Sequence, residues 1–229
     1  MKRAIIIGAT SGIGKALTLR YLAQGDRVGI TGRRLSLLNE IEDSHPEQVF
    51  VQQMDITHPE AADQLRQLAE KMGGMDLCIV CSGIGTQNRQ LIPEEELRTV
   101  ETNSIGFTRM VTAAFNYFRQ QGHGQLAVIS SIAGTKGLGV SPSYSATKRF
   151  QSVYIQSLAQ LATIERLNIR FTTIFPGFIH TDLLKQGDYP LTMNLDRASY
   201  LIFKAIEKKK RRDQLLLQQE ETKKEKEIL

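Results

Sequence analysis

The sequence predicts an α/β protein, a doubly wound parallel sheet with helices on both faces. Short apolar runs of strand length alternate along the chain with longer segments of helical spacing. Strands that alternate with helices are joined by right-handed crossovers into a parallel sheet. A chain of 229 residues, 41% hydrophobic and 23% charged, suits one domain with a sizeable core. We therefore expect a single α/β domain.

The first predicted strand ends in a glycine loop. Residues 3–14 read Arg-Ala-Ile-Ile-Ile-Gly-Ala-Thr-Ser-Gly-Ile-Gly, and Lys15–Gln24 has the spacing of a helix. The glycines at 8, 12 and 14 would let the backbone approach a bound group at the start of that helix, where free N–H groups and the helix dipole favour phosphate. The spacing G-x-x-x-G-x-G thus indicates a nucleotide-binding loop, although glycine turns also follow buried strands in other α/β proteins.

The later elements follow from the same two patterns. Pro59 is expected in the first turn of its helix, and Gly122 and Gly124 are expected to break the chain before a strand. The predicted strands are Arg27–Thr31, Gln48–Gln53, Met75–Val80, Gln125–Ile129 and Arg170–Phe175. The predicted helices are Leu35–Asp43, Pro59–Lys71, a stretch from Pro93, Thr102–Gln121 and Tyr144–Arg166. In such a fold, ligands bind beyond the carboxyl ends of the strands.

Charge and hydropathy exclude several partners. Of the formal net charge of +5, residues 208–229 hold +3, with eight Lys or Arg against five Asp or Glu. The rest of the chain offers no strong basic face, so we expect no nucleic-acid partner. The basic run 208–212 is typical of solvated cations at a helix end, with a nucleic-acid or membrane patch as the alternative. No apolar run is long enough for a signal peptide or a membrane span, so we expect a cytoplasmic protein.

The two cysteines form a C-x-x-C motif, which in other settings marks a redox or zinc site. Cys78 and Cys81 belong to the predicted strand region around Met75–Val80, where residues three apart point to opposite faces. We therefore expect no disulfide between them. The four histidines are scattered along the chain, and we expect no metal site.

One helix carries a candidate acid–base pair. Tyr144 and Lys148 lie four residues apart on one helical face. An ammonium beside a phenol lowers the pKa of the phenol from about 10, which makes the phenol a proton donor near neutral pH. Tyr200 and Lys204 have the same spacing. Only Tyr144 has a serine thirteen residues before it at the end of a predicted strand, and that serine is Ser131. We expect the first pair to be chemical and Tyr200 to be a packing residue.

Together these motifs resemble the short-chain dehydrogenase/reductase family over about residues 3–207. The resemblance implies a single Rossmann-like domain over residues 1–207, with 208–229 as a charged C-terminal tail of uncertain structure. It implies an NAD(P)(H)-dependent oxidoreductase that transfers hydride between nicotinamide and a carbonyl or alcohol substrate. The family's catalytic roles fall on four residues: Tyr144 exchanges a proton with the substrate oxygen, Ser131 orients that oxygen, Lys148 lowers the pKa of the tyrosine and holds the ribose, and Asn103 anchors a water that relays protons to Lys148.

The resemblance also assigns the cofactor contacts. Arg33 and Arg34 follow the second strand, where an NAD enzyme usually has an acid, and both can pair with a 2′-phosphate. The sequence therefore favours NADP(H) over NAD(H), with Arg33 as the preferred contact. The expected cofactor-binding residues are Gly8, Thr10, Ser11, Gly12, Ile13, Gly14, Arg33, Arg34, Asp55, Ile56, Gly83, Tyr144, Lys148, Pro176, Gly177, Ile179 and Thr181.

The chain departs from the family pattern in three places. Ile7 replaces a threonine, and Val80-Cys81-Ser82-Gly83 replaces the Asn-Asn-Ala-Gly segment that chiefly braces the sheet in the family. The family's seventh strand and Asp-Gly-Gly segment give way to a charged segment, in which residues 213–218 fit a short strand or a helix equally well.

Two further features concern the substrate and the assembly. Thr181–Leu195 resembles the family's mobile lid, and its apolar residues indicate a hydrophobic substrate unless they pack on the core. Thr102–Gln121 and Tyr144–Arg166 resemble the helices through which the family dimerises, and the second is apolar on more than one face, so we expect a homodimer. The lid's apolar residues are Leu183, Leu184, Tyr189, Leu191 and Met193.

Two alternatives to an oxidoreductase are a non-catalytic NADP(H)-sensing protein and a methyltransferase on a similar sheet.

Overall fold

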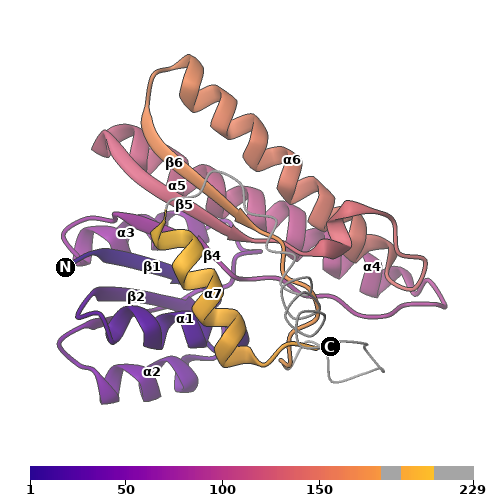
Figure 1. The fold of residues 1–229 in the computed structure, drawn as a ribbon, viewed down its shortest axis with the longest axis horizontal. Helices are drawn as coiled ribbons and strands as arrows, with labels where there is room; N and C mark the ends of the chain where they lie inside the picture. Colours follow the sequence, from indigo (N-terminus) through magenta and orange to yellow (C-terminus); the bar gives the residue numbers. More distant parts are fainter. Residues whose placement is uncertain (182–191, 209–229) are drawn as a thin grey trace, which may run out of the picture.

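The computed structural model describes residues 1–181 and 192–208. Six strands form one sheet in the order β3-β2-β1-β4-β5-β6, and every neighbouring pair is parallel, as the sequence predicts (Figure 1). The strands are β1 (Arg3–Ile7), β2 (Arg27–Gly32), β3 (Val49–Gln53), β4 (Leu77–Val80), β5 (His123–Ile129) and β6 (Asn168–Ile174). The helices are α1 (Gly12–Leu22), α2 (Leu35–Ser44), α3 (Ala61–Lys71), α4 (Pro93–Val100), α5 (Phe107–Gln121), α6 (Pro142–Ile164) and α7 (Leu195–Glu207).

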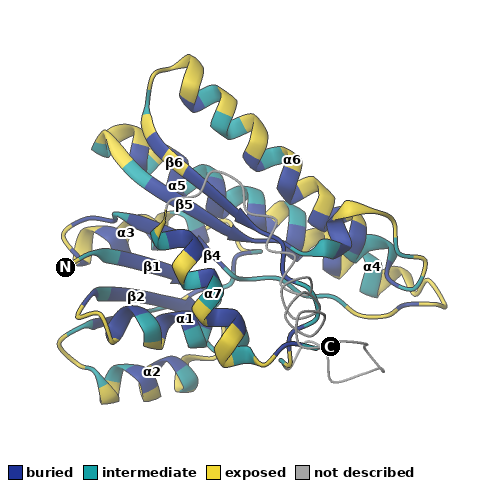
Figure 2. Ribbon diagram, in the orientation of Figure 1, coloured by how far each residue is buried: buried dark blue, intermediate teal, exposed yellow. Residues whose placement is uncertain are grey.

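Helices cover both faces of this sheet, and each face has its own core. One core joins the sheet to α3, α5 and α6, and the other joins it to α1, α2 and α7. Because successive strand residues point to opposite faces, β1 contributes Ile5 and Ile7 to the first core and Ala4 and Ile6 to the second. A strand buried on both faces has no polar side, which explains the continuous apolar runs of the sequence. Figure 2 shows the buried strands between helices that are exposed on their outer sides.

Several elements begin at residues other than the predicted ones. α1 begins at Gly12 rather than Lys15, so the glycine loop supplies its first turn. The prediction that Pro59 lies in the first turn of a helix was wrong: α3 begins at Ala61, after a turn in which the Ala61 N–H bonds to the carbonyl of His58. Gly124 was also wrongly predicted to break the chain, because it lies inside β5.

A close approach explains why a glycine stands inside β5. A Cβ at Gly124 would overlap the ring of Phe118, which packs across the strand. Gly122 alone makes the break, since its φ of 89° ends α5 in the left-handed conformation.

The two helices predicted between Pro93 and Gln121 form one helical stretch with a π-helical turn, Glu101–Gly106, between α4 and α5. In this turn the N–H of Phe107 reaches the carbonyl of Thr102, five residues back. Single π turns within α-helices occur frequently at functional sites. Asn103 lies in this turn and is fully buried.

The two cysteines lie on opposite sides of the sheet, as predicted. Cys78 belongs to the core under α3 and α5, whereas Cys81 packs against the core under α1 and α7, and both are free thiols. In the described ranges, 1–181 and 192–208, no group of three or more His, Cys, Asp or Glu is placed to hold a metal ion, and no helix is long and apolar enough to cross a membrane.

Parts of two predicted segments fall outside the described residues. These are the tail beyond residue 208, with the strand or helix considered at 213–218, and residues 182–191 of the lid. Met193, at the end of the predicted lid, is described: it is buried and bridges to Ile179, so this apolar side chain packs on the core.

Candidate active site

The glycine loop packs tightly beneath the start of α1. Gly8 and Gly12 have φ values of 91° and 54°, which side chains rarely adopt. A Cβ at Gly8 would lie 2.7 Å from the backbone nitrogen of Ser82, and a Cβ at Gly14 would overlap the carbonyl oxygen of Gly8. Ser11, the N-cap of α1, makes no side-chain capping bond, and the first turn holds no acidic residue. The first N–H groups and the positive end of the helix dipole are therefore placed to bind a phosphate.

Two arginines follow β2 at the edge of this loop. Arg34 donates from Nη2 to Thr10 Oγ1 at 2.7 Å and to Ser11 Oγ at 2.9 Å. Arg33 is exposed, and its positive charge acts on Asp55. Arg34 therefore stabilises the loop itself, and Arg33 is an exposed cation next to it.

Asp55 follows β3 and is held as a carboxylate. Partial burial would raise its pKa, but the N–H and hydroxyl of Thr57, at 3.0 and 2.8 Å, together with Arg33, lower it below the usual range. The neighbouring Ile56 lies against the π turn, because a Cβ at Gly106 would come within 2.8 Å of its Cγ1. Asp55 and Ile56, two of the predicted cofactor-binding residues, therefore lie between Arg33, which follows β2, and the π turn.

The segment after β4 runs between the glycine loop and α6. A Cβ at Gly83 would lie 3.3 Å from Asn103 Oδ1 and 3.4 Å from Lys148 Nζ. A Cβ at Gly85 would lie 2.7 Å from Cε2 of Tyr144. Ser82, next to Gly83, has a buried hydroxyl oxygen without a hydrogen-bond partner among the described residues. Such an orphaned polar atom next to the glycine loop fits a site built for a polar ligand.

Ser131 follows β5 and caps a 3₁₀-helix, Ile132–Thr135. Its Oγ accepts from the N–H of Ala133 at 3.1 Å, so its hydroxyl hydrogen is available for another acceptor. Gly134 of the 3₁₀-helix packs directly on α6, since a Cβ there would lie 2.8 Å from the carbonyl carbon of Lys148. This contact sets the spacing between Ser131 and the helix that carries Tyr144.

Tyr144 and Lys148 share one side of α6, with Lys148 Nζ 5.7 Å from the centre of the tyrosine ring. The ammonium is 5% exposed and donates to the carbonyl of Ile129 at 3.1 Å and to Oε1 of Gln151 at 3.2 Å. Burial lowers the pKa of Lys148 to about 8, against a smaller opposing effect of the Cys81 thiol. Burial therefore makes this ammonium more acidic than that of an exposed lysine.

The start of α6 is positioned by a residue that the sequence reasoning missed. Ser141, its N-cap, makes no side-chain capping bond, and Glu96 of α4 instead accepts from the N–H of Ser143 at 3.0 Å. Glu96 also accepts from Asn88 at 2.8 Å, so the loop before α4 and the start of α6 are tied together beside Tyr144. No local pattern identifies this cap, because the two residues lie 47 positions apart.

Asn103 is held by four hydrogen bonds. Its Oδ1 accepts from the N–H of Ile84 at 2.9 Å, and its side-chain amide donates to the Ile84 carbonyl at 2.7 Å and to Thr147 Oγ1 at 3.2 Å. Its backbone carbonyl accepts from Nε2 of Gln151 at 2.9 Å. Gln151 therefore stands between Asn103 and Lys148. The sequence reasoning missed Gln151; the available signal was a glutamine one helical turn after Lys148 on a buried side of α6.

The segment after β6 closes the site over the glycine loop. The carbonyl of Pro176 accepts from the N–H of Ile132 at 3.0 Å, which joins this segment to the one that begins at Ser131. Ile179 shares a small apolar cluster with Ile13 of the loop. A Cβ at Gly12 would lie 3.5 Å from Cγ2 of Thr181. The structure thus brings together the segments that begin at Gly8, Gly83, Ser131, Tyr144 and Pro176.

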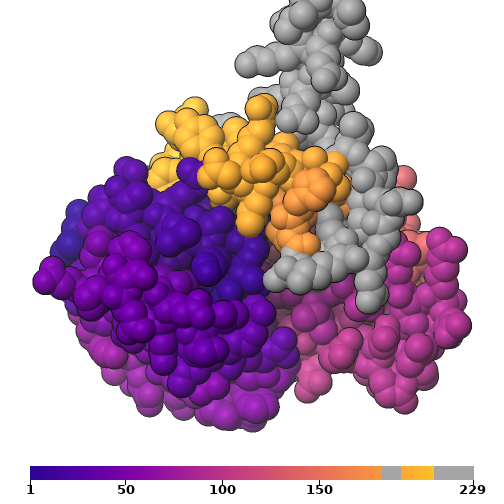
Figure 3. Space-filling view, turned by 90° about the horizontal axis from the view of Figure 1, so that it is seen from below, coloured from indigo at the N-terminus to yellow at the C-terminus, as the bar shows by residue number. Residues whose placement is uncertain are grey.

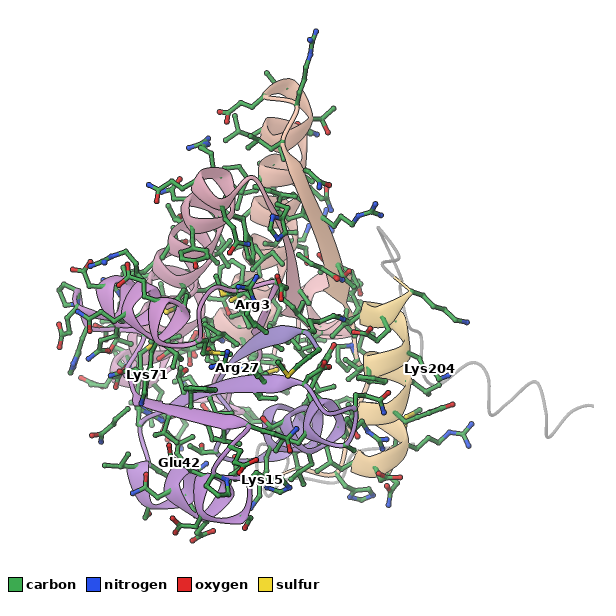
Figure 4. All side chains as sticks on the ribbon, turned by 90° about the vertical axis from the view of Figure 1, so that its left-hand side faces the viewer. Arg3, Lys15, Arg27, Glu42, Lys71 and Lys204 are labelled. Carbon is green, nitrogen blue, oxygen red and sulfur yellow. The ribbon has the colours of Figure 1, made fainter. Side chains whose placement is uncertain are left out.

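The second Tyr-x-x-x-Lys pair lies on α7. Tyr200 is 45% exposed, with Arg20 and Lys204 each 5.5 Å from its ring centre, so its ring packs against two cationic side chains at the surface. Figure 3 shows α7, in yellow, against the N-terminal part of the chain, and Figure 4 shows Lys204 on this helix. Arg3 and Arg27, also labelled in Figure 4, mark the amino-terminal end of the sheet, opposite the site.

A pocket of about 570 Å³ lies between the start of α6 and the loop before it. It contains none of the residues predicted for the site. Its lining consists of Gly134, Thr135, Lys136, Gly137, Leu138, Gly139, Pro142, Ser145, Ala146 and Arg149.

Comparisons with known proteins agree with this geometry. The family model for short chain dehydrogenases matches residues 2–189. An uncharacterized oxidoreductase of Myxococcus xanthus is 32% identical over 83% of this chain and 77% of its own length. An NADP-dependent 3-hydroxy acid dehydrogenase of Shigella flexneri is 28% identical over 76% of this chain and 71% of its own length.

Solved structures share the fold. A serine dehydrogenase in complex with NADP⁺ superposes with a TM-score of 0.78 at 24% identity, covering 88% of this chain and 87% of the other. An alcohol dehydrogenase from Thermococcus sibiricus in complex with 5-hydroxy-NADP also has a TM-score of 0.78, at 22% identity, with 90% and 91% covered. With the strand order, the solved structures establish a Rossmann-like domain, and the family match with its oxidoreductase relatives establishes an oxidoreductase. The chain belongs to the short-chain dehydrogenase family.

Proposed function

We propose that the protein is an NADPH-preferring oxidoreductase that interconverts a carbonyl compound and its alcohol. The observation that carries this proposal is the placement of Tyr144 beside the buried ammonium of Lys148, on a helix packed against the segment that begins at Ser131. A nicotinamide nucleotide, when bound, supplies or accepts the hydride. The glycine loop, the uncapped start of α1 and the orphaned hydroxyl of Ser82 fit such a group.

Three side chains divide the proton chemistry. In the direction of reduction, the hydroxyl of Tyr144 donates a proton to the carbonyl oxygen, and in oxidation it takes the proton back. Ser131 donates its free hydroxyl hydrogen to the same oxygen and so orients the substrate, while its Oγ stays fixed by the N–H of Ala133. The cation of Lys148 favours the ionised phenol and so lowers the pKa of Tyr144.

The preference for NADPH rests on the two arginines after β2. Arg34 is bonded to the loop hydroxyls of Thr10 and Ser11, which supports Arg33 as the partner of a 2′-phosphate. The similarity to an NADP-dependent 3-hydroxy acid dehydrogenase supports the same preference.

A homodimer is the assembly we propose. Five apolar side chains on α4, the π turn and α6 are exposed at 38–67% in the single chain, and three of them, Ile105, Phe150 and Val153, lie in the two segments that the family resemblance assigns to dimerisation. The rings of Phe150 and Tyr154 on α6 stack at 5.6 Å between their centres. The five are Leu97, Val100, Ile105, Phe150 and Val153.

The test of the proposed reaction is a panel of aldehydes, ketones and alcohols, followed by nicotinamide absorbance with NADPH or NADP⁺. On a substrate found in the panel, Tyr144→Phe keeps the ring but removes the hydroxyl, so kcat should fall by about 10² to 10⁴ while NADPH affinity changes little. Tyr200→Phe is the matched control and should stay within a few-fold of wild type. Normal turnover by Tyr144→Phe would refute the site. NADPH binding without turnover of any compound would instead favour a dinucleotide sensor.

A further inference from the structure

Gln151 links the buried ammonium to the π turn. It is 1% exposed, its Nε2 donates to the carbonyl of Asn103 at 2.9 Å, and its Oε1 accepts from Lys148 Nζ at 3.2 Å. A backbone carbonyl can only accept a hydrogen bond, and an ammonium can only donate. The amide therefore has one orientation that satisfies both neighbours, and that orientation turns its oxygen to Lys148.

This contact limits the hydrogen bonds that the Lys148 ammonium can still donate. An ammonium has three donors, and the carbonyl of Ile129 and Oε1 of Gln151 occupy two of them. One N–H therefore remains for the side of the site where Gly83 and the ring of Tyr144 lie. A glutamate of the same length would place an acceptor oxygen against the carbonyl oxygen of Asn103. A methionine would offer no strong hydrogen-bond partner to Asn103 or to Lys148.

We propose that Gln151 is a positioning residue that holds the Lys148 ammonium in its protonated form and fixes the direction of its remaining N–H. The catalytic importance of this contact rests on the proposed function. Its effect on the protonation of Lys148 does not, and can be measured in the free protein. In this arrangement a side-chain amide joins Asn103 to Lys148, where the family resemblance implies a water. The fixed acceptor offsets part of the unfavourable burial of the cation.

Few other charges face the ammonium. Among the described residues, the titratable groups beside it are the thiol of Cys81, at the end of β4, and the phenol of Tyr144, on α6 itself. Burial raises the pKa of Cys81 to about 12, so the thiol stays protonated while Lys148 titrates. The phenol can be removed by mutation. The titration of Lys148 therefore reports mainly on its burial and its acceptors.

The experiment measures this titration directly by NMR of the free protein labelled with [¹³Cε]lysine. The Lys148 resonance is assigned by its loss in Lys148→Met, and each midpoint is measured in a Tyr144→Phe background. Gln151→Met, which keeps the length of the side chain but removes the acceptor, should lower the midpoint by about one pH unit, because a hydrogen bond to a charged group is lost. Gln151→Glu places a carboxylate beside the ammonium and should raise the midpoint. Gln156→Met, at an exposed glutamine on the same helix, should not move it.

The following outcomes decide the proposal. A midpoint in Gln151→Met equal to that of wild type would overturn it, as would an equal shift in Gln156→Met. If Gln151→Met does not fold, Gln151→Asn decides: it keeps an amide but withdraws its oxygen from Lys148, so the midpoint should fall, and an unmoved midpoint would overturn the proposal. With the Tyr144 hydroxyl restored, the pH at which NADPH affinity declines should shift in the same directions. Shifted midpoints in a protein that reduces no carbonyl would support the role of Gln151 and refute only the proposed reaction.

Discussion

Alanine at Gly85 would displace Tyr144 without changing any group that reacts. The new Cβ would lie 2.7 Å from Cε2 and 2.9 Å from Cγ of the ring, whereas ordinary contacts begin at 3.4 Å. Because Cγ lies close to the backbone, swinging the far edge of the ring cannot relieve the overlap. The φ of Gly85 lies outside the left-handed range, so the effect comes from the contact and not from backbone strain. The ring has to move by roughly half an ångström to one ångström.

The expected cost is mainly catalytic. A misplacement of about 1 Å in a catalytic group can cost about 10²-fold in rate, so kcat of Gly85→Ala should fall by up to that factor. Overpacking of this kind should also cost about 1–3 kcal/mol of stability. Steady-state kinetics on a substrate from the panel measure the first effect, and urea unfolding measures the second. NADPH fluorescence titration separates both from cofactor binding.

Gly137→Ala is the matched control, because a Cβ at Gly137 meets nothing within 4 Å. It should leave kcat and stability close to wild type. The reasoning fails if Gly85→Ala retains the wild-type kcat. It also fails if both variants lose activity to the same degree, since the loss would then not depend on the tyrosine ring.

Three further predictions concern the cofactor, the assembly and pH. Arg33→Ala should weaken NADPH binding much more than NADH binding in fluorescence titrations, and equal wild-type affinities for the two nucleotides would contradict the preference. Val153→Asp should convert a dimer to a monomer in analytical ultracentrifugation while the similarly exposed Leu19→Asp should not, and a monomeric wild type at micromolar concentration would exclude the dimer. Burial lowers the pKa of Lys148 from 10.5 to about 8 in the folded protein, so between these values the unfolded chain binds more protons and stability rises with pH. Relative to Lys148→Met, wild type should therefore gain about 3 kcal/mol of unfolding free energy from pH 7 to 10.5 in urea titrations, and a difference that does not depend on pH would refute the burial argument.

The sequence predicted the sheet because its signals are local. The inner strands β1 and β4 are buried on both faces, so each appears as an apolar run, and the loop from Gly8 to Gly14 marks the turn that follows β1. The positions of Tyr144 and Lys148 could also be predicted, since a spacing of four places two residues on one side of a helix. Whether these residues carry the reaction stays a prediction.

What the sequence did not reveal depends on contacts between distant segments. Glu96 caps α6 across 47 residues, and Gln151 reaches Asn103 across 48. Gly124 resembled a break because glycine is rare inside strands, yet the ring of Phe118 requires it there. The π turn left no sign in the periodicity, because it adds one residue to a helix without changing which residues are apolar.

The contact between Gly12 and Thr181 links ligand binding to the stability of the whole fold. These residues lie near opposite ends of the described chain, and the site exists only when the first and the sixth strands have joined the same sheet. An unfolded or half-folded chain therefore has no place for the dinucleotide, and every bound molecule favours the complete fold. A dinucleotide present at a hundred times its Kd would add about 2.7 kcal/mol to the free energy of unfolding. A bound cofactor would thus slow any proteolysis that proceeds through the unfolded chain.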